Sequence, residues 1–422
     1  MAMRQRRFSV GLLLLVSTVG SSGAWGAQPP AVPDPSIMLP LVPTAAQVGA
    51  PPCIKPGTRL TYFGMTASIP GEYGKLVQDD EGNWIDKNTG TRYRQEKIGA
   101  SGSAAFNVVS VGHVGGGVVE LSTKLYSLDT ATKKCGFAVG GGMVGHAGCA
   151  ADYWIHPEVL AQVAEVNAQG VRILRMPYTL EGRTYRAIRF QTDDISGYQA
   201  HVYDLDTGLM IFHASRRQGQ SVLTAPIGGE GMAGMGEGSA QLVTLWLVER
   251  KDIDVPWKDA PPPQWIERFG QLSYRGVQTS VVSVAGSKLD RAMTATLTPK
   301  ACGPGWVRFT NRYLFESLPG MPPNEATQDG ASGAATIGGL WISPQALGNL
   351  RPGQLIETNE KVGTTVTVSD VRPGAATISE VGPLHRTDCT YDMRTGVLSA
   401  MTIVQQIGLA SITHRIQLVS PP

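Results

Sequence analysis

The sequence predicts an all-β fold of two tandem, duplicated domains, each a curved antiparallel sheet or open barrel with one short helix. Three observations lead to this class. Segments of the chain recur at a nearly constant spacing, and apolar residues alternate with polar ones over short stretches. The 51 glycines and 28 prolines break these stretches into pieces bounded by turns, which is typical of an all-β protein.

The duplication is visible at several places along the chain. The segment 203–209 returns as 391–397 with Tyr, Asp, Thr and Gly at the same places, so the offset is 391 − 203 = 188. The segment 154–160 returns as 341–347 with an offset of 187, and the stretch that begins at Gly115 has a counterpart 188 residues later. A nearly constant offset at separate places indicates two structural copies.

The N-terminus has the order of charge, apolar run and small residues that marks a secretory signal peptide. Basic residues precede the apolar run 10–16, and small residues follow as far as Gly26. Residues 1–26 are therefore expected to be removed on export, which predicts a periplasmic or secreted protein. The Pro-rich segment 27–56 is expected to be an extended tether. The basic residues are Arg4, Arg6 and Arg7.

The charge of the chain excludes two classes of partner. The formal charge of +2 includes three leader arginines, so the exported chain has 36 − 3 = 33 basic against 34 acidic side chains. Such a balance gives no electrostatic attraction to nucleic acid or to anionic membranes. No apolar run after the leader approaches the ~20 residues that span a bilayer, so no membrane span is expected.

A Pro-rich linker is expected to separate the two copies. Residues 253–263 contain a run of prolines, which continues neither a helix nor a central strand. The first copy is therefore expected at 57–252 and the second at 264–422.

The first copy carries two additions to the shared pattern. Leu60 matches Leu272 at an offset of 212, so 212 − 188 = 24 extra residues follow this strand. They fall near 72–100 and are expected to form a protruding hairpin whose deletion spares folding. The second addition is the Gly/Met-rich loop 218–239. Because added loops often carry function, the first copy is the expected place of activity.

Within each copy a period of two predicts half-buried strands. In 119–125 and 307–315 apolar residues alternate with polar ones, so the polar side chains are expected to face solvent. Short helices are expected at 154–166 and 341–350, since each has a Pro where the first turn tolerates it. The repeated Thr-Gly pairs are expected to close hairpins, and the glycines 140–142 to form a turn.

The five cysteines are sorted by comparing the copies. Cys135 and Cys149 have no counterparts in the second copy, and Cys302 and Cys389 have none in the first. Because each copy gains its cysteines as a pair, the disulfides Cys135–Cys149 and Cys302–Cys389 are predicted for an oxidising compartment. Cys53 is the odd cysteine, and three alternatives stay open for it: a free thiol, a bond to another chain, or a place in one of these two pairs.

The sequence lacks the common catalytic and nucleotide-binding signatures, so its strongest chemical candidate is a histidine pair. If Thr207 lies at the centre of a hairpin loop, His201 and His213 stand opposite each other on one face, where they could share a metal. Two imidazoles are insufficient without a third ligand. The simpler interpretation is a solvated or core pair, and no metal is assigned.

A second candidate is a copper site in the first copy. Met143, His146 and Cys149 lie close in sequence, and soft sulfur and imidazole ligands suit copper. Met232 and Met235 could join them. Cys149 is also needed for the predicted disulfide, so copper stays an alternative and no cofactor is assigned.

These observations favour an exported, non-enzymatic binding or assembly protein that holds an apolar ligand or a polypeptide in a curved sheet. One alternative is a secreted hydrolase whose site is assembled from loops, with His113, His146 or His156 as the base. The other is a periplasmic copper-binding protein. A polar cleft that joins one histidine to a Ser or carboxylate favours the hydrolase, and an apolar groove favours the carrier.

Overall fold

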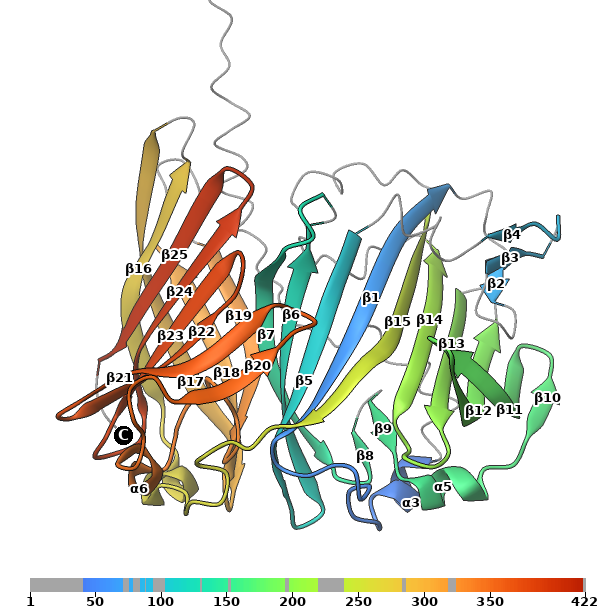
Figure 1. Cartoon of the computed structure of the whole chain (residues 1–422), viewed down its shortest axis with the longest axis horizontal. Helices are drawn as coiled ribbons and strands as arrows, with labels where there is room; N and C mark the ends of the chain where they lie inside the picture. The colour runs from blue at the N-terminus through green and yellow to red at the C-terminus, as the bar shows by residue number, and fades with distance from the viewer. Residues whose placement is uncertain are drawn as a thin grey trace, which may run out of the picture.

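The computed structural model describes residues 41–70, 76–78, 84–87, 89–93, 103–129, 131–150, 153–193, 197–218, 239–282, 286–317 and 324–419. Two large antiparallel sheets of 12 and 10 strands stand side by side (Figure 1). The predicted all-β class with two repeated halves is confirmed. The predicted signal peptide 1–26, residues 27–40 of the predicted tether and most of the Gly/Met-rich loop lie outside the described residues.

The first sheet belongs to the first half of the chain. Its order is β10-β11-β12-β13-β14-β15-β1-β5-β6-β7-β8-β9. Its strands are β1 (Thr58–Pro70), β5 (Ser103–Gly115), β6 (Val118–Leu128), β7 (Cys135–His146), β8 (Cys149–Ala150), β9 (Trp154–Ile155), β10 (Val166–Ala168), β11 (Val171–Leu180), β12 (Arg183–Asp193), β13 (Gly197–Asp204), β14 (Met210–Gln218) and β15 (Ser239–Asp252).

The second sheet belongs to the second half. Its order is β19-β18-β17-β16-β25-β24-β23-β22-β21-β20. Its strands are β16 (Leu272–Val282), β17 (Ser287–Gly303), β18 (Trp306–Phe315), β19 (Asn324–Gly333), β20 (Leu355–Asn359), β21 (Thr364–Arg372), β22 (Ala375–Val381), β23 (His385–Asp392), β24 (Leu398–Ile407) and β25 (Ala410–Leu418).

The two sheets have the same topology. In the first, β1 is flanked by β5-β6-β7 on one side and by β15 back to β10 on the other. In the second, β16 is flanked by β17-β18-β19 and by β25 back to β20. Each strand of the second sheet therefore has a counterpart in the first, as the constant offset predicts.

The repeated motifs occupy the same structural positions. Trp154 forms an isolated bridge to Leu209, and Trp341 forms the same bridge to Val397. The turn glycine beside each bridge has a φ of 75°, which only glycine adopts without strain. The aspartates that open the two turns accept hydrogen bonds within their own loops, as expected.

Short helices close one end of each sheet (Figure 1). The expected helices are present but shorter, as α5 (Pro157–Gln162) and α6 (Pro344–Leu347), each with a Pro in its first turn. The structure adds a short helix α3 (Val42–Ala45) and a 3-10 helix η3 (Gln264–Arg268). Among the described residues no helix is both long and apolar enough to cross a membrane.

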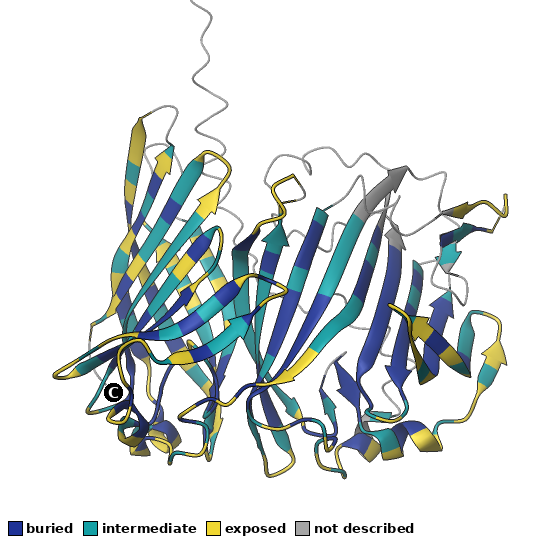
Figure 2. Cartoon of the chain, in the orientation of Figure 1, coloured by how far each residue is buried: buried dark blue, intermediate teal, exposed yellow. Residues whose placement is uncertain are grey.

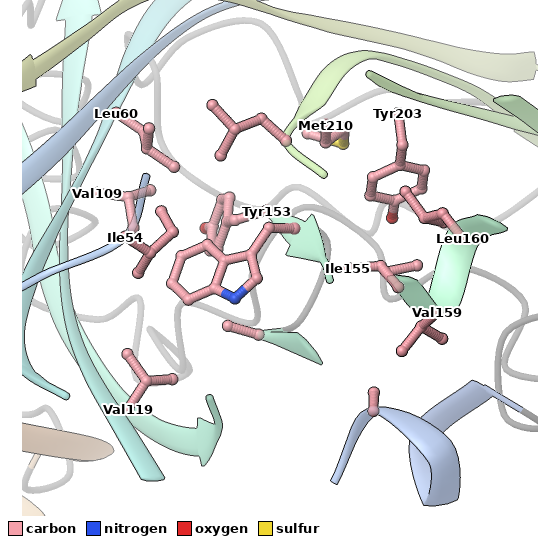
Figure 3. Close-up of a cluster of buried hydrophobic side chains, with 14 of the residues drawn as sticks. Ile54, Leu60, Val109, Val119, Tyr153, Ile155, Val159, Leu160, Tyr203 and Met210 are labelled. Carbon is pink, nitrogen blue, oxygen red and sulfur yellow. The ribbon is translucent and has the colours of Figure 1, made fainter. Parts of the chain in front are cut away.

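A large apolar cluster fills the helical end of the first half (Figure 3). Trp154 is fully buried there, and its indole nitrogen donates a hydrogen bond of 2.9 Å to the carbonyl oxygen of Ala147. Tyr153 and Tyr203 lie in the same cluster. Trp341, the counterpart of Trp154 in the second half, is 1% exposed. The repeated Trp is therefore buried in the core of both halves.

Two segments expected to be loose are part of the core. Ala45 and Ile54 are buried in the first apolar cluster, so residues 41–56 are not an extended tether. Val255 and Trp257, in the predicted linker, are buried in a cluster of the second half. Prolines prevent regular strands in both segments, but they do not prevent apolar side chains from packing.

The insertion of the first half is not a free hairpin. It contains a separate sheet of β2 (Leu76–Gln78), β3 (Trp84–Asp86) and β4 (Arg92–Tyr93). Trp84 is fully buried, and its ring meets the ring of Tyr198 edge-on at 5.8 Å. Lys87 forms an ion pair with Asp193. This packing argues against the expectation that deleting 75–97 spares folding, because Trp84 is part of an apolar cluster on the first sheet.

The two halves pack closely where β6 and β7 of the first meet β19 of the second. The glycines 140–142, expected to form a turn, lie within β7. A side chain at Gly142 would overlap the backbone of Ala331, so the glycine allows the two strands to approach. The carbonyl oxygen of Gly140 accepts a hydrogen bond from Gln328 of β19.

Candidate functional site

The inner face of the second sheet is the best candidate for a binding site. Along β16 the buried and exposed positions alternate, with Tyr274 and Gln278 on the inner face and Arg275 and Val277 on the outer (Figure 2). Neighbouring strands continue both faces, because directly paired residues of an antiparallel sheet point to the same side.

The part of this inner face that packs against the 3-10 helix η3 is apolar. The cluster there includes Tyr274, Met293, Ala295 and Ile416, with Met401 packed against it. Tyr274 donates a hydrogen bond of 2.8 Å to the carbonyl oxygen of Leu398, which satisfies its hydroxyl. We call this surface the apolar floor. Tyr274, Met293, Ala295 and Ile416 are at most 8% exposed, and Met293 and Met401 are unbranched and flexible.

A row of polar side chains stands next to the apolar floor. Gln278 of β16 pairs directly with Arg291 of β17 on one side and with His414 of β25 on the other. Ser280 follows on the same face of β16. We call these four residues the polar band. Gln278, Ser280 and Arg291 are only 3%, 7% and 7% exposed.

Most of the polar band lacks partners. Within the described residues the side chains of Gln278, Ser280 and His414 make no hydrogen bond to protein. Their polar atoms are not among the fully enclosed atoms without a partner, so they reach solvent. Such polar atoms inside a protein normally bind water or a ligand.

Arg291 is a buried cation without a carboxylate partner in the described chain. Its guanidinium donates to the backbone carbonyl oxygen of Glu316 at 2.9 and 3.3 Å and lies 5.5 Å from the ring centre of Phe315. Burial lowers the pKa of Arg291, and Glu316, whose side chain is exposed, opposes that shift. The guanidinium stays charged at neutral pH, because arginine is not deprotonated in proteins.

His414 contributes a neutral group to the band. Burial lowers its pKa to about 4, so the imidazole is uncharged at neutral pH. It can then donate from one nitrogen and accept at the other. Arg291 is therefore the one positive charge of the four residues.

The band has no counterpart in the first half. At the offsets of the repeat, Arg291 falls on Ser103 (291 − 103 = 188) and Gln278 on Thr66 (278 − 66 = 212). The structure bears out this match, since Thr66 pairs with Ser103 on one side and with Val243 on the other. The equivalent row of the first sheet is therefore uncharged.

The first half closes one side of the inner face through a buried ionic cluster. Glu380 of β22 forms an ion pair with Lys124 of β6 and accepts a hydrogen bond of 2.6 Å from Tyr126. The Nε2 atom of His385 lies 3.1 Å from the same carboxylate. Burial alone would raise the pKa of Glu380, but Lys124, His385 and Tyr126 hold it well below its usual range.

Two more ionisable groups join the halves. Arg59 of β1 is 1% exposed and forms ion pairs with Glu249 of the first half and Glu357 of the second. Glu120 of β6 is fully buried and accepts a hydrogen bond of 2.9 Å from Thr336. Glu120 and Lys124 were expected to face solvent. That expectation is wrong, because the second half covers the polar face of β6.

The histidine pair is present as predicted from the hairpin. His201 and His213 are directly paired across β13 and β14, with ring centres 4.3 Å apart. Both are 2% exposed. Burial, followed by the charge of His213, keeps the pKa of His201 well below its usual value. No group of three His, Cys, Asp or Glu suited to a metal occurs in the described parts of the chain.

The residues of the copper alternative do not converge. Met143 packs against the first apolar cluster, whereas His146 is exposed at the end of β7. They are three residues apart on one strand, so they point to opposite faces. Met232 and Met235 lie outside the described residues.

The three candidate bases of the hydrolase alternative are also dispersed. His156 accepts a hydrogen bond of 3.3 Å from the backbone nitrogen of Glu158 and thereby caps α5. His113 is half-buried at the end of β5, where burial lowers its pKa. His146 is exposed. Each belongs to a different element, and within the described parts of the chain none forms a hydrogen bond or ion pair with a Ser or carboxylate side chain.

The predicted disulfides are not formed, since all five cysteines are free. Cys135 begins β7, and Cys149 pairs with His146 at its other end, so the full length of the strand, about 35 Å, separates them. Cys302 is exposed on β17, and three strands stand between it and buried Cys389 on β23. A disulfide needs Cα atoms about 4.4–6.8 Å apart.

Comparisons with known proteins do not assign a family. No family model matches the chain, and no curated protein matches it. A solved protein of unknown function from the DUF3598 family of Nostoc punctiforme PCC 73102 is similar at 8% identity, over 86% of this chain and 96% of that one, with a TM-score of 0.13. A double mutant of transferrin binding protein B from Haemophilus parasuis Hp5 is similar at 7% identity, over 88% and 78%, with a TM-score of 0.14. At such scores neither likeness carries a conclusion about function.

Sequence reasoning missed the residues that define this site. Arg291 and Gln278 occupy ordinary alternating positions, and polar residues also occupy the exposed face of their strands. The signal that could have found them is the comparison of the copies. A cation that falls on a serine of the other copy is a change on an otherwise shared scaffold.

Proposed function

We propose that this chain is an exported, non-enzymatic binding protein that holds an apolar or amphiphilic ligand against the inner face of its second sheet. Export is supported by the signal-peptide pattern of residues 1–26. One observation carries the binding role. Gln278, Ser280 and His414, whose side chains make no hydrogen bond to the described chain, stand in a row with Arg291 next to an apolar floor.

That arrangement has the composition of a ligand site. Small-molecule sites are mostly apolar and carry a few placed polar groups that fix the orientation of the ligand. The floor supplies the apolar surface, and the polar band supplies the placed groups. The first half serves as support, because its strands β6 and β7 and its residues Lys124 and Arg59 fix the open side of the second sheet.

Native mass spectrometry of the protein purified from its source tests this proposal. We expect a discrete adduct with the mass of one small amphiphile, lost after extraction with organic solvent. The extracted protein should then bind dodecanoate saturably. If the purified protein has the mass of the polypeptide alone and binds neither dodecanoate nor dodecanol saturably, a carrier role is contradicted.

A further inference from the structure

We infer that the ligand is a single-chain amphiphile with an anionic head group, held by Arg291 while its apolar chain lies on the floor of the second sheet. This inference rests on the proposed binding function and adds the charge of the ligand. It commits the site to one orientation, with the head group at the polar band.

The first support is the charge of Arg291. A buried guanidinium normally meets a carboxylate or phosphate, often through two parallel hydrogen bonds. Arg291 instead meets only a backbone carbonyl and an aromatic ring within the described residues. The exposed carboxylate of Glu316 accepts from the backbone nitrogen of Ala292 and forms no ion pair with Arg291.

The second support is the set of neutral donors around this charge. Gln278 pairs directly with Arg291. Ser280 and His414 are the neighbours of Gln278 on the same face. An amide, a hydroxyl and a neutral imidazole can each donate a hydrogen bond to an oxyanion. Together they can hold a carboxylate, sulfate or phosphate head group.

The third support is the position of the apolar floor. Met293 is two residues from Arg291 on the same face of β17, and Ile416 has the same relation to His414 on β25. The lining of the inner face therefore changes from polar to apolar between one row of side chains and the next. The row that matches the band in the first half is Thr66, Ser103 and Val243, which cannot neutralise an anion.

Isothermal titration calorimetry on the solvent-extracted full chain tests the inference with three ligands of equal chain length. Dodecanoate, dodecanol and dodecyltrimethylammonium have an anionic, a neutral and a cationic head group. We expect dodecanoate to bind about ten- to hundredfold more tightly than dodecanol, because hydrogen bonds to charged groups contribute that much. Dodecyl sulfate should bind like dodecanoate, which would show that the site recognises the anion rather than the carboxylate alone.

Two substitutions locate the effect. Arg291→Gln should remove the preference for dodecanoate and leave dodecanol binding within about twofold, whereas Arg291→Lys should keep part of it. The matched control is Arg275→Gln, on the exposed outer face of β16, which should change neither affinity. Thermal melts establish that each variant is folded.

The outcomes separate this inference from the proposed function. Equal affinities of the wild type for dodecanoate and dodecanol overturn the anionic head group but leave a carrier of apolar ligands. The same holds if folded Arg291→Gln binds dodecanoate as tightly as the wild type. If none of the ligands binds, the proposed function itself fails.

Discussion

Replacing Glu120 by Gln should change how the stability of the protein depends on pH. Glu120 is fully buried between the halves, where Thr336 donates to its Oε2 atom at 2.9 Å and the Oε1 atom has no partner in the described chain. Burial raises its pKa to about 8, against hydrogen bonds from Thr336, Gly333 and Gly112 that favour the charged form. The native state therefore holds this carboxyl protonated near neutral pH.

The sign and size of the effect follow from linkage. Between the unfolded pKa of 4.5 and the native pKa of about 8, the native state binds a proton that the unfolded state releases. The stability that Glu120 contributes is complete below pH 4.5 and is lost as the pH rises through 8. The difference corresponds to (8 − 4.5) × 1.36, at most about 5 kcal/mol. Glutamine is neutral throughout and has no such loss.

Urea unfolding followed by tryptophan fluorescence measures this effect. At pH 4.5 we expect Glu120→Gln and the wild type to have similar free energies of unfolding, and at pH 8 we expect the variant to be the more stable by several kcal/mol. Glu325→Gln is the matched control, because that carboxylate is exposed and paired with Arg312. It should follow the wild type over this range. A Glu120→Gln variant that loses stability with pH as steeply as the wild type would refute the buried, protonated carboxyl.

Three further predictions test other parts of the structure. Glu380→Gln leaves Lys124 without its counter-charge and should cost about 2–4 kcal/mol in urea unfolding. Adding Lys124→Met should recover part of that loss, and strictly additive losses would show that the pair is not coupled. Trp84→Ala should cost about 3–5 kcal/mol, because the ring is fully buried, and an unchanged melt would show that the inserted sheet does not pack as described. Alkylation of the unreduced, unfolded protein should modify all five cysteines, whereas a linked peptide containing Cys135 and Cys149 would contradict the observed strand β7.

The repeat in the sequence predicts the topology of this protein well. A constant offset requires equivalent strands, and the structure has them in the same order in both sheets. Local pattern also predicts the direct pairing of His201 and His213, because a hairpin turn fixes the register of its two strands.

What covers a strand could not be predicted from its own pattern. The alternation in β6 correctly predicts a strand, but it assigns Glu120 and Lys124 to solvent, because a single strand carries no information on the surface that packs against its polar face. The two disulfides predicted from the sequence are wrong for a related reason. Comparing copies shows which cysteines are new, but only the path of β7 shows that Cys135 and Cys149 lie at its opposite ends.

The most direct test of the central claim is hydrogen–deuterium exchange of the solvent-extracted protein with and without dodecanoate. Ligand on the inner face of the second sheet should slow exchange in β16, β17 and β25, which carry the polar band. The equivalent strands β1, β5 and β15 of the first sheet should be unchanged. Protection confined to the first sheet, or no protection in either, would contradict a binding site on the second.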